Sequence, residues 1–558
     1  IALLILHNGQ QQRILTEIVS MSLTNGDLRE MTTFKDSEAN VSSAHDESGI
    51  VKEPDSVLKD ISLDGRESFT CVEEANPIPA EEGKLTWSLI LAVLALVIGS
   101  SFQVGYHIGC INSSKNLIED FIRETSFVDN PERFNATGAW IWASIVSAFP
   151  FGAIFGSLFA ATLADTYGRK TTLFFNNIPA AIAGSLMIFA YPFKLWYLLL
   201  IGRLIIGVNA GVSSGVISTF LTELAPDNLR GMLGSCNQLF LTIAILFSNV
   251  LSFKVIFGSE TRWQYIFGLT FFPVIAQLVL LKFCPESPRY TLVFEGDEAK
   301  AEKDLIALRG KSDVRSEIEA IKREVTEREN EPQITFSTLF NRELRWATFV
   351  AIFLMFMQQM TGINAAIYYS NGIFGSTGLV ADQVVAATCA MMLANVLMTF
   401  ASTSLVDHPR FGRRSLLLTG MLGMFFTSIA IVIALVLIDK KNYVTESRVG
   451  AVIFMVLFVI AFATGPGSIP WFYASELFAS NARASATAVA CAVNWGMNFV
   501  VGLLFPPIQQ ELTSYTFLIF TIALFICAII TLIYVPETKG KSVREVQTDL
   551  QKRRPACI

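Results

Sequence analysis

Twelve apolar stretches of about 20 residues follow one another from Leu85 onward, with short polar breaks between them. A helix of this length crosses a hydrocarbon core ~30 Å thick. Hydrophobic residues make up 52% of the 558 residues and charged residues only 16%, whereas soluble domains average about 25% charged residues. The pattern therefore predicts an all-α membrane protein with twelve transmembrane helices, and it argues against a soluble enzyme.

The longest polar interruption follows the sixth apolar stretch and divides the set into two groups of six. Within it, apolar residues such as Val314 and Ile318 recur at helical spacing among many charges, as on a surface helix with one apolar stripe. We therefore predict five segments, which are a disordered cytosolic tail at 1–84, a six-helix bundle at 85–283, a cytosolic helical linker at 284–345, a second six-helix bundle at 346–534 and a cytosolic tail at 535–558.

Lysine and arginine residues gather at one set of helix ends, and this sets the expected orientation. Basic residues favour the cytosolic side, so the clusters at Arg169-Lys170 and Arg413-Arg414 predict that both termini are cytosolic. The sequon at Asn135 then falls in the first outer loop, where a glycan acceptor has to lie. We expect a multi-pass protein of the plasma membrane that is glycosylated at Asn135.

Charged motifs recur at equivalent ends of the two six-helix groups. Arg169 recurs as Arg413, and Glu286 recurs as Glu537, in each case about 250 residues further along. A glutamate also precedes an arginine by seven residues in both groups, in the pairs Glu223/Arg230 and Glu476/Arg483. The repetition indicates a duplicated six-helix unit. Such pairs of units are typical of transporters whose halves rock about a site near the middle of the membrane.

The repeated charges then have a predicted mechanical role. When the cytosolic ends of the two halves meet, the repeated glutamates can pair with the repeated arginines and close an inner gate. The residues of this predicted gate are Glu223, Glu286, Glu476, Arg169, Arg230, Arg413 and Arg483. The alternative is anchoring by positive charge, with surface pairs worth about 0–1 kcal/mol each. Anchoring alone does not require glutamates at matching positions, which favours the gate.

Several longer motifs resemble one known family. They are Gly202-Arg203, Glu223 to Gly231, Pro285 to Arg289, Gln358 to Asn364, Gly465 to Phe472, Asn494-Trp495 and Val535 to Gly540. At these motifs the chain resembles the sugar porter branch of the major facilitator superfamily, and most closely the animal facilitative hexose transporters. The resemblance covers about residues 85 to 545 and implies the major facilitator fold, with two pseudo-symmetric six-helix bundles and a hexose as the partner.

Amide side chains at membrane depth are the candidate substrate-binding residues, because an unpaired polar group is costly there. A neutral hexose requires groups that donate to and accept from its hydroxyls, and an indole for its apolar face. The candidates are Gln238, Gln358, Gln359, Asn364, Asn395, Asn494 and the indole of Trp471. Three of the amides fall within two turns of one predicted helix, the seventh. The alternative for any single amide is a hydrogen bond between helices. The resemblance implies that the six amide positions contact sugar.

The tenth apolar stretch contains residues that an unbroken helix does not accommodate. They are Gly465, Pro466, Gly467 and Pro470, and each proline removes a backbone donor and clashes with the preceding turn. We therefore predict a bend or break beside Trp471. The resemblance implies that this segment is the inner gate and that Tyr368 and Tyr369 lie near an outer gate. Trp495 is a further gating candidate, with ordinary helix packing as its alternative.

Two departures from the family pattern leave the sugar preference open. Family glucose carriers have a glutamate just before the tenth-helix break, where this chain has Ala463. The Gln-Leu-Ser that the family associates with glucose is replaced by Met355-Phe356-Met357. A fructose-preferring carrier therefore remains an alternative to a glucose carrier.

His107 poses the question of proton coupling. Proton-linked relatives carry an aspartate after the Gly-Tyr pair of the first helix and uniporters carry an asparagine, whereas this chain has Gly105-Tyr106-His107. Histidine has an unperturbed pKa near physiological pH. A neutral imidazole that donates one hydrogen bond behaves like the asparagine, so we expect passive uniport, with a proton-coupled symporter as the alternative.

Other functional classes find little support. The formal net charge of −6 argues against a nucleic-acid partner. The closest approach to an ATP-binding loop, Gly540-Lys541-Ser542, has Val535 where a glycine is required. No catalytic or metal-binding motif appears, so we expect no enzymatic activity, no cofactor and no metal. A sugar sensor that keeps the fold but does not transport is the remaining alternative, and the lipid bilayer is the expected environment.

Overall fold

The computed structural model describes residues 83–127, 131–330, 336–441, 444–478, 480–541 and 543–554. Most of the predicted tail at 1–84 therefore lies outside the described residues. Gly83, at the start of the described part, is tied to the bundle, because its N–H donates to Asn228 Oδ1 at 3.2 Å and its carbonyl accepts from Asn228 Nδ2 at 3.0 Å.

The described part of the chain is helical. The first group comprises α3 (Trp87–Leu96), the π-helical turn η1 (Val97–Ser101), α4 (Phe102–Ser113), α5 (Lys115–Ser126), α6 (Pro131–Tyr167), α7 (Arg169–Phe189), α8 (Tyr197–Leu224), α9 (Arg230–Leu251), α10 (Gln264–Gly268) and α11 (Phe271–Leu280). The linker carries α12 (Pro288–Tyr290), α13 (Glu298–Arg309) and α14 (Arg315–Asn330). The second group comprises α15 (Arg345–Met360), α16 (Ile363–Ser376), α17 (Ala381–Asp407), α18 (Arg413–Asp439), α19 (Val444–Thr464), α20 (Ile469–Leu477), α21 (Ser480–Leu512) and α22 (Phe517–Tyr534), and α23 (Val543–Lys552) follows it.

Twelve segments of the described chain are long and apolar enough to cross a membrane, which agrees with the number predicted from the sequence. Some of them contain more than one helix. The first segment joins α3, η1 and α4, the sixth joins α10 and α11, the seventh joins α15 and α16, and the tenth joins α19 and α20. Six segments precede the linker and six follow it. We call these two groups the N-half and the C-half.

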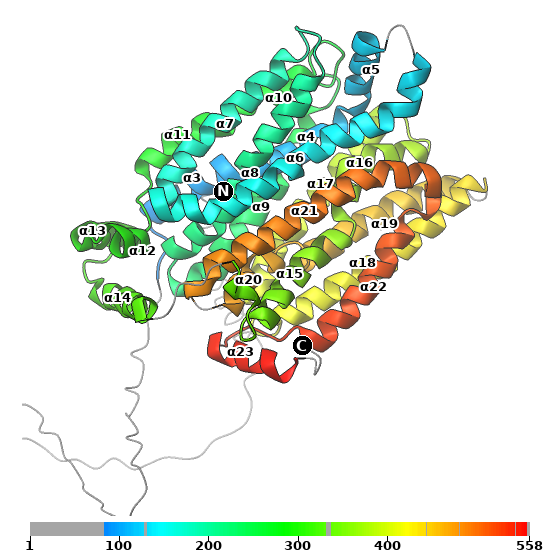
Figure 1. Ribbon diagram of the computed structural model, residues 1–558. Coiled ribbons are helices and arrows are strands. Elements are labelled where there is room, and N and C mark those ends of the chain that lie inside the picture. The colour runs from blue at the N-terminus through cyan, green and yellow to red at the C-terminus, as the bar shows by residue number, and fades with distance from the viewer. Residues whose placement is uncertain are drawn as a thin grey trace, which may run out of the picture. The chain divides into compact units, whose positions relative to one another are not determined.

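The two halves lie side by side and pack along two helix pairs, α6 with α21 and α9 with α17 (Figure 1). Helices α12–α14 and α23 lie at one end of the molecule, and α5 lies at the opposite end. We call these the linker end and the α5 end. The linker is fastened to the N-half, because Arg309 donates to the Leu224 carbonyl at 2.8 Å and Thr86 donates to the Leu308 carbonyl at 2.8 Å.

Glycines hold the N-half together where α6 crosses α8. A Cβ added at Gly207 would lie 2.1 Å from the Phe149 carbonyl oxygen, and one added at Gly152 would lie 2.1 Å from the Leu204 carbonyl oxygen. Only a residue without a side chain permits this approach of two backbones, as in other membrane helix pairs. The N-half is therefore closely packed at its centre.

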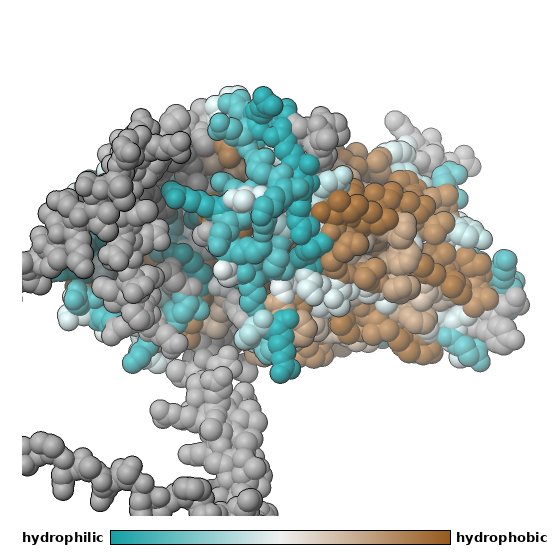
Figure 2. Space-filling view, turned by 90° about the horizontal axis from the view of Figure 1, so that it is seen from below, coloured by the Kyte–Doolittle hydropathy of each residue, from teal (hydrophilic) through white to brown (hydrophobic). Residues whose placement is uncertain are grey.

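The surface matches a membrane environment. A hydrophobic belt runs across the face shown in Figure 2, with hydrophilic surface on both sides of it. Large apolar side chains are exposed on α18 and α22, among them Phe426, Ile433, Ile522, Phe525 and Leu532. Exposed apolar area of this extent is rare on soluble monomers and is typical of lipid-facing helices.

Candidate functional site

A cavity lies between the two halves and has a volume of about 740 Å³, part of it open to solvent. All seven residues predicted to bind substrate line it, together with Trp495. The polar lining is Ser101, Ser214, Asn237, Gln238, Thr242, Gln358, Gln359, Asn364, Asn395, Asn494 and Asn498.

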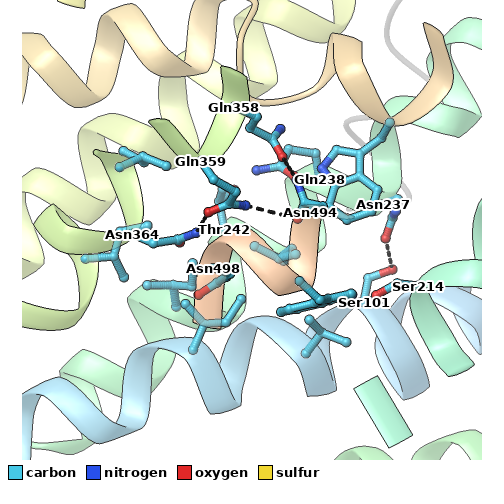
Figure 3. A pocket seen from close by; sticks show the side chains of 18 of the residues that line it. Ser101, Ser214, Asn237, Gln238, Thr242, Gln358, Gln359, Asn364, Asn494 and Asn498 are labelled. Atoms are coloured by element: carbon cyan, nitrogen blue, oxygen red, sulfur yellow. Dashed lines mark hydrogen bonds between the residues drawn. The ribbon is translucent and has the colours of Figure 1, made fainter. Parts of the chain in front are cut away.

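The C-half contributes a connected network of amides (Figure 3). Asn494 is at its centre, because its Nδ2 donates to Gln358 Oε1 at 2.7 Å and its Oδ1 accepts from Gln359 Nε2 at 3.0 Å. Asn364 donates to the side-chain oxygen of Gln359, Oε1. Asn395 also lines the cavity, where its oxygen accepts from Thr399 at 3.3 Å. The network holds buried polar groups in fixed positions and so orients the site before a ligand enters.

The seventh membrane segment is broken within this network. Helix α15 ends at Met360 and α16 begins at Ile363, with Gly362 between them at φ +84°. The expectation that Gln358, Gln359 and Asn364 share two turns of one helix is therefore wrong, since Asn364 lies beyond the break. Glycine adopts a positive φ without steric penalty. A single glycine is also tolerated inside many helices, so the sequence did not indicate the break.

The tenth segment is broken at the residues that the sequence singled out. Helix α19 ends at Thr464 and α20 begins at Ile469, so that Gly465, Pro466 and Gly467 lie in the break and Pro470 lies in the first turn of α20. The amide nitrogen of Gln358 donates to the carbonyls of Pro466 and Gly467 at 2.9 and 2.8 Å. This side chain satisfies backbone carbonyls that the break frees, and it thereby couples the break to the amide network.

The N-half contributes separate polar groups. Ser101, the last residue of η1, donates to Asn237 Oδ1 at 2.7 Å, and Ser214 of α8 and Thr242 of α9 also line the cavity. The side chain of Gln238 lines the cavity and forms no hydrogen bond within the part of the chain that the structure describes. Asn237 and, in the C-half, Asn498 were not predicted. Each is near a predicted residue, one position from Gln238 and one helical turn from Asn494.

Two indoles complete the lining. Trp471 of α20 is half-buried in the wall of the cavity. Trp495 of α21 is buried and meets Phe149 of the N-half edge to face, with ring centres 5.6 Å apart. The Trp495 ring therefore contacts both the cavity and the opposite half, and its indole N–H has no partner in the described part of the chain.

The halves are joined by hydrogen bonds toward the α5 end. Asn112 of α4 donates to Ser370 of α16 at 2.7 Å, and its oxygen accepts from the Asn371 N–H at 3.4 Å. Tyr368 and Tyr369 are buried nearby on α16. They bind within the C-half, to Asn498 Oδ1 at 3.1 Å and to the Gly502 carbonyl at 2.7 Å.

At the linker end, the charges of the N-half form one buried cluster. Arg169 pairs with Glu223 at 3.1 Å, with less than a tenth of either side chain exposed. The carboxylate of Glu286 accepts from the N–H groups of Arg169 and Lys170 at 3.1 Å and so caps the N-terminus of α7, where an anion is favoured. Burial raises the pKa of Glu286, although the N–H groups of Ser287 and Lys170 oppose this shift.

The C-half repeats this arrangement with equivalent residues. Glu537 accepts from the N–H groups of Arg413 and Arg414 at 2.8 and 3.1 Å and caps α18. Arg413 lies 3.7 Å from Glu476, which also accepts a hydrogen bond from Thr538. Glu537 was recognised as the repeat of Glu286 but was not predicted as a gate residue.

The Arg169–Glu223 and Arg413–Glu476 ion pairs each join two residues of the same half. Glu223 lies at the end of α8, next to the start of α7, and this local packing brings it to Arg169. Arg230 donates to the Thr222 carbonyl at 3.4 Å, and Arg483 donates to the Phe478 carbonyl at 3.5 Å. The clusters thus brace the helix ends of each half.

His107 does not line the cavity. It is fully buried inside the N-half, with Nε2 3.1 Å from the Thr270 hydroxyl. The buried guanidinium of Arg203 donates to its backbone carbonyl at 2.6 Å. A charged imidazole would place a second positive charge beside this buried cation.

Two other predicted positions lie away from the described site. Ala463 is buried and does not line the cavity, whereas the neighbouring Phe462 does. A change of sugar preference through position 463 would therefore be indirect. The side chain of Asn135, near the start of α6, lies outside the described residues.

Comparisons with known proteins agree with this architecture. The family model described as "Sugar (and other) transporter" matches residues 92–550. The chain is 43% identical to facilitated glucose transporter protein 1 of Caenorhabditis elegans over 478 residues, which cover 85% of this chain and 92% of that protein. It is 38% identical to the solute carrier family 2, facilitated glucose transporter member 5 of Equus caballus, over 85% of this chain and 94% of that protein. The solved proton:xylose symporter XylE bound to 6-bromo-6-deoxy-D-glucose superposes with a TM-score of 0.70 at 23% identity, over 83% of this chain and 98% of that chain.

Proposed function

The chain belongs to the sugar transporter family, and on that premise we propose that it carries glucose or a related hexose across the plasma membrane by facilitated, alternating-access uniport. One observation carries the proposal. The cavity between the halves is lined by amides, hydroxyls and an indole, and none of its described lining residues is charged. Such a lining suits a neutral polyol, whose hydroxyls both donate and accept, and it suits an ion poorly.

The amide network supports sugar recognition at the membrane midplane. Gln358, Gln359 and Asn494 are already oriented by one another, so a hexose does not have to order them on binding. The predicted substrate-binding residues are Gln238, Gln358, Gln359, Asn364, Asn395, Asn494 and Trp471.

The helix breaks support a gating role for the C-half. Half-helices α16 and α20 can tilt at Gly362 and at Gly465–Ser468 while the remainder of each segment stays packed. We propose that the α20 break opens and closes the path to the linker end and that Tyr368 and Tyr369 act at the α5 end. The charge clusters around Arg169 and Arg413 keep each half rigid as it moves.

Passive transport is supported by the position of His107. It binds Thr270 inside the N-half, away from the sugar cavity, and therefore lacks direct contact with a bound sugar. Uptake of labelled glucose and fructose into proteoliposomes, with and without a pH gradient, tests this proposal. We expect saturable uptake that stops at equal concentrations and does not depend on the gradient. Accumulation above equilibrium that a protonophore abolishes would establish the proton-coupled alternative, and a higher rate with fructose would identify a fructose carrier.

We propose that the linker end faces the cytosol, because basic residues gather at the helix ends there. Asn135 then lies on the outer face and carries a glycan. Digestion of the cell-surface protein with an endoglycosidase should lower its apparent mass, and Asn135→Gln should remove that shift. An unglycosylated Asn135, together with labelling of the linker-end lysines from outside the cell, would show that the linker end faces outward.

A further inference from the structure

A second cavity adjoins the central one on the side of the linker end. Its volume is about 450 Å³, part of it open to solvent, and it is lined by α8 and α9 of the N-half and by α20 and α21 of the C-half. Asn237 and Trp471 line both cavities. These two side chains therefore mark where the two cavities adjoin.

One face of α8 carries a row of hydroxyls along this path. Ser214 lines the central cavity, and Ser218 and Thr222, four and eight residues further on, line the second one. The spacing places all three on one face of the helix. Ser218 donates to the Ser214 carbonyl at 3.4 Å and Thr222 donates to the Ser218 carbonyl at 3.2 Å. The hydroxyl protons of Ser218 and Thr222 thus form hydrogen bonds to carbonyls of α8, and the hydroxyl oxygens remain able to accept a hydrogen bond from a ligand.

The opposite wall supplies complementary groups. Trp471 presents an indole, and Thr487 of α21 adds a hydroxyl. Asn237 is oriented by Ser101, which donates to its oxygen, so that its amide nitrogen is left to donate. Acceptors, an amide donor and an aromatic face also line the central cavity, and Arg483 of α21 adds to the second cavity a charged donor that the described lining of the central one lacks.

We propose that this second cavity is a release site for the same neutral hexose, where the sugar is held by Ser218, Thr222, Asn237 and the other face of the Trp471 indole after it leaves the central amides. The proposal rests on the proposed hexose transport. The hydroxyls of α8 and Asn237 then bind the sugar on its way to the linker end. The sugar thus binds twice along the exit path, first in the central cavity and then in the second one.

Sugar protection of a cysteine placed in the second cavity tests the proposal. Thr222→Cys is introduced, and its alkylation by a maleimide is followed by mass spectrometry at that position in protein held in nanodiscs. The same variant is also made with Asn494→Ala, which disables the central network. We expect D-glucose to slow alkylation several-fold in both proteins, and L-glucose to have no effect.

A matched control separates occupancy from closure of the path. Ala484→Cys places the label in an adjoining cavity lined by Asp165, Arg169 and Ala484, which shares Thr219 and Thr487 with the second cavity but none of the residues proposed to hold the sugar. We expect no protection at this position. Equal protection at positions 222 and 484, or protection at 222 that requires an intact Asn494, would show that sugar acts from the central site, and the proposal would be wrong. Absence of transport by the unmodified protein in proteoliposomes would instead contradict the proposed function.

Discussion

The N-half and the C-half are repeats of one unit, yet glycine serves an additional purpose in the C-half. In the N-half, glycines such as Gly152 and Gly207 lie where α6 and α8 touch, and they bring two helices into backbone contact. In the C-half, Gly362 and Gly465 lie where the seventh and tenth segments break. Glycine therefore serves close packing in the N-half, and in the C-half it also permits the two breaks that border the amide network.

The polar groups of the cavity follow the same division. The amides of the C-half bind one another and the carbonyls freed by a break, so binding and bending are linked there. The N-half presents Gln238 and a few hydroxyls from helices that are continuous on that side of the cavity, except for the π-helical turn η1. A fixed N-half and a jointed C-half can expose one site to two sides with few moving parts.

The largest expected effect comes from disturbing the rigid half. Gly207→Val adds a branched side chain where even a Cβ would lie 2.1 Å from a backbone oxygen. Overpacking of this kind costs about 3 kcal/mol, so we expect a much lower yield of folded protein and a clearly lower thermal unfolding temperature. The matched variant Gly372→Val lies in the C-half, where no atom comes within 4 Å of an added Cβ, and it should be tolerated. Equal losses would show that the close contact between α6 and α8 at Gly207 does not cause the effect.

The second largest effect is expected on the KM for hexose when an amide is removed from the C-half side of the cavity rather than from the N-half side. Asn494→Ala leaves the Gln358 Oε1 and Gln359 Nε2 atoms without the buried partner that Asn494 supplies, at about 1–3 kcal/mol per group. We expect the KM for hexose uptake to rise about 10-fold to 100-fold. Gln238→Ala removes an amide without a partner in the described chain and should raise KM less than about 10-fold. A larger effect of Gln238→Ala, with both variants equally folded, would place recognition in the N-half.

A substitution at Gly362 tests whether the break between α15 and α16 moves during transport. Gly362→Ala puts a side chain at φ +84°, with its Cβ 2.6 Å from the Phe520 ring, and an L-residue in this conformation costs about 1–2 kcal/mol. Because the strain acts on the break, we expect a lower maximal uptake rate with a small change in KM. Gly372→Ala on the same helix α16 is the control and should leave the rate unchanged. An unchanged rate for Gly362→Ala would mean that the break does not move during transport.

The smallest effect is a pH dependence at the N-half cap. The pKa of Glu286 is raised by burial, so this carboxyl holds its proton more strongly in the folded protein than in the unfolded one. Its contribution to stability is therefore fully present below the unfolded pKa and is lost as pH rises through the higher folded pKa. Relative to Glu286→Gln, the unmodified protein should lose stability as the pH rises above the unfolded pKa of a glutamate, about 4.3. Thermal unfolding at a series of pH values above it measures the difference, and a gain in relative stability with rising pH would contradict it.

Local chemistry explains which features could be predicted from the sequence. The twelve crossings followed from the length of the apolar stretches, and the tenth-segment break followed from two prolines and two glycines. The break at Gly362 was missed because a lone glycine does not reveal its φ. Asn237 and Asn498 were missed because the direction of a side chain depends on how its helix is rotated in the bundle. The partners of Arg169 and Arg413 depend on packing within each half, which the repeat alone does not determine.

Counterflow in proteoliposomes tests the central claim most directly, namely that one cavity is exposed alternately to both sides. Vesicles are loaded with unlabelled D-glucose and diluted into a trace of labelled D-glucose. We predict that the loaded vesicles transiently accumulate more labelled sugar than unloaded vesicles do. The accumulation should be smaller with the Asn494→Ala variant. Sugar binding without any transient accumulation would contradict transport and would identify the protein as a sensor.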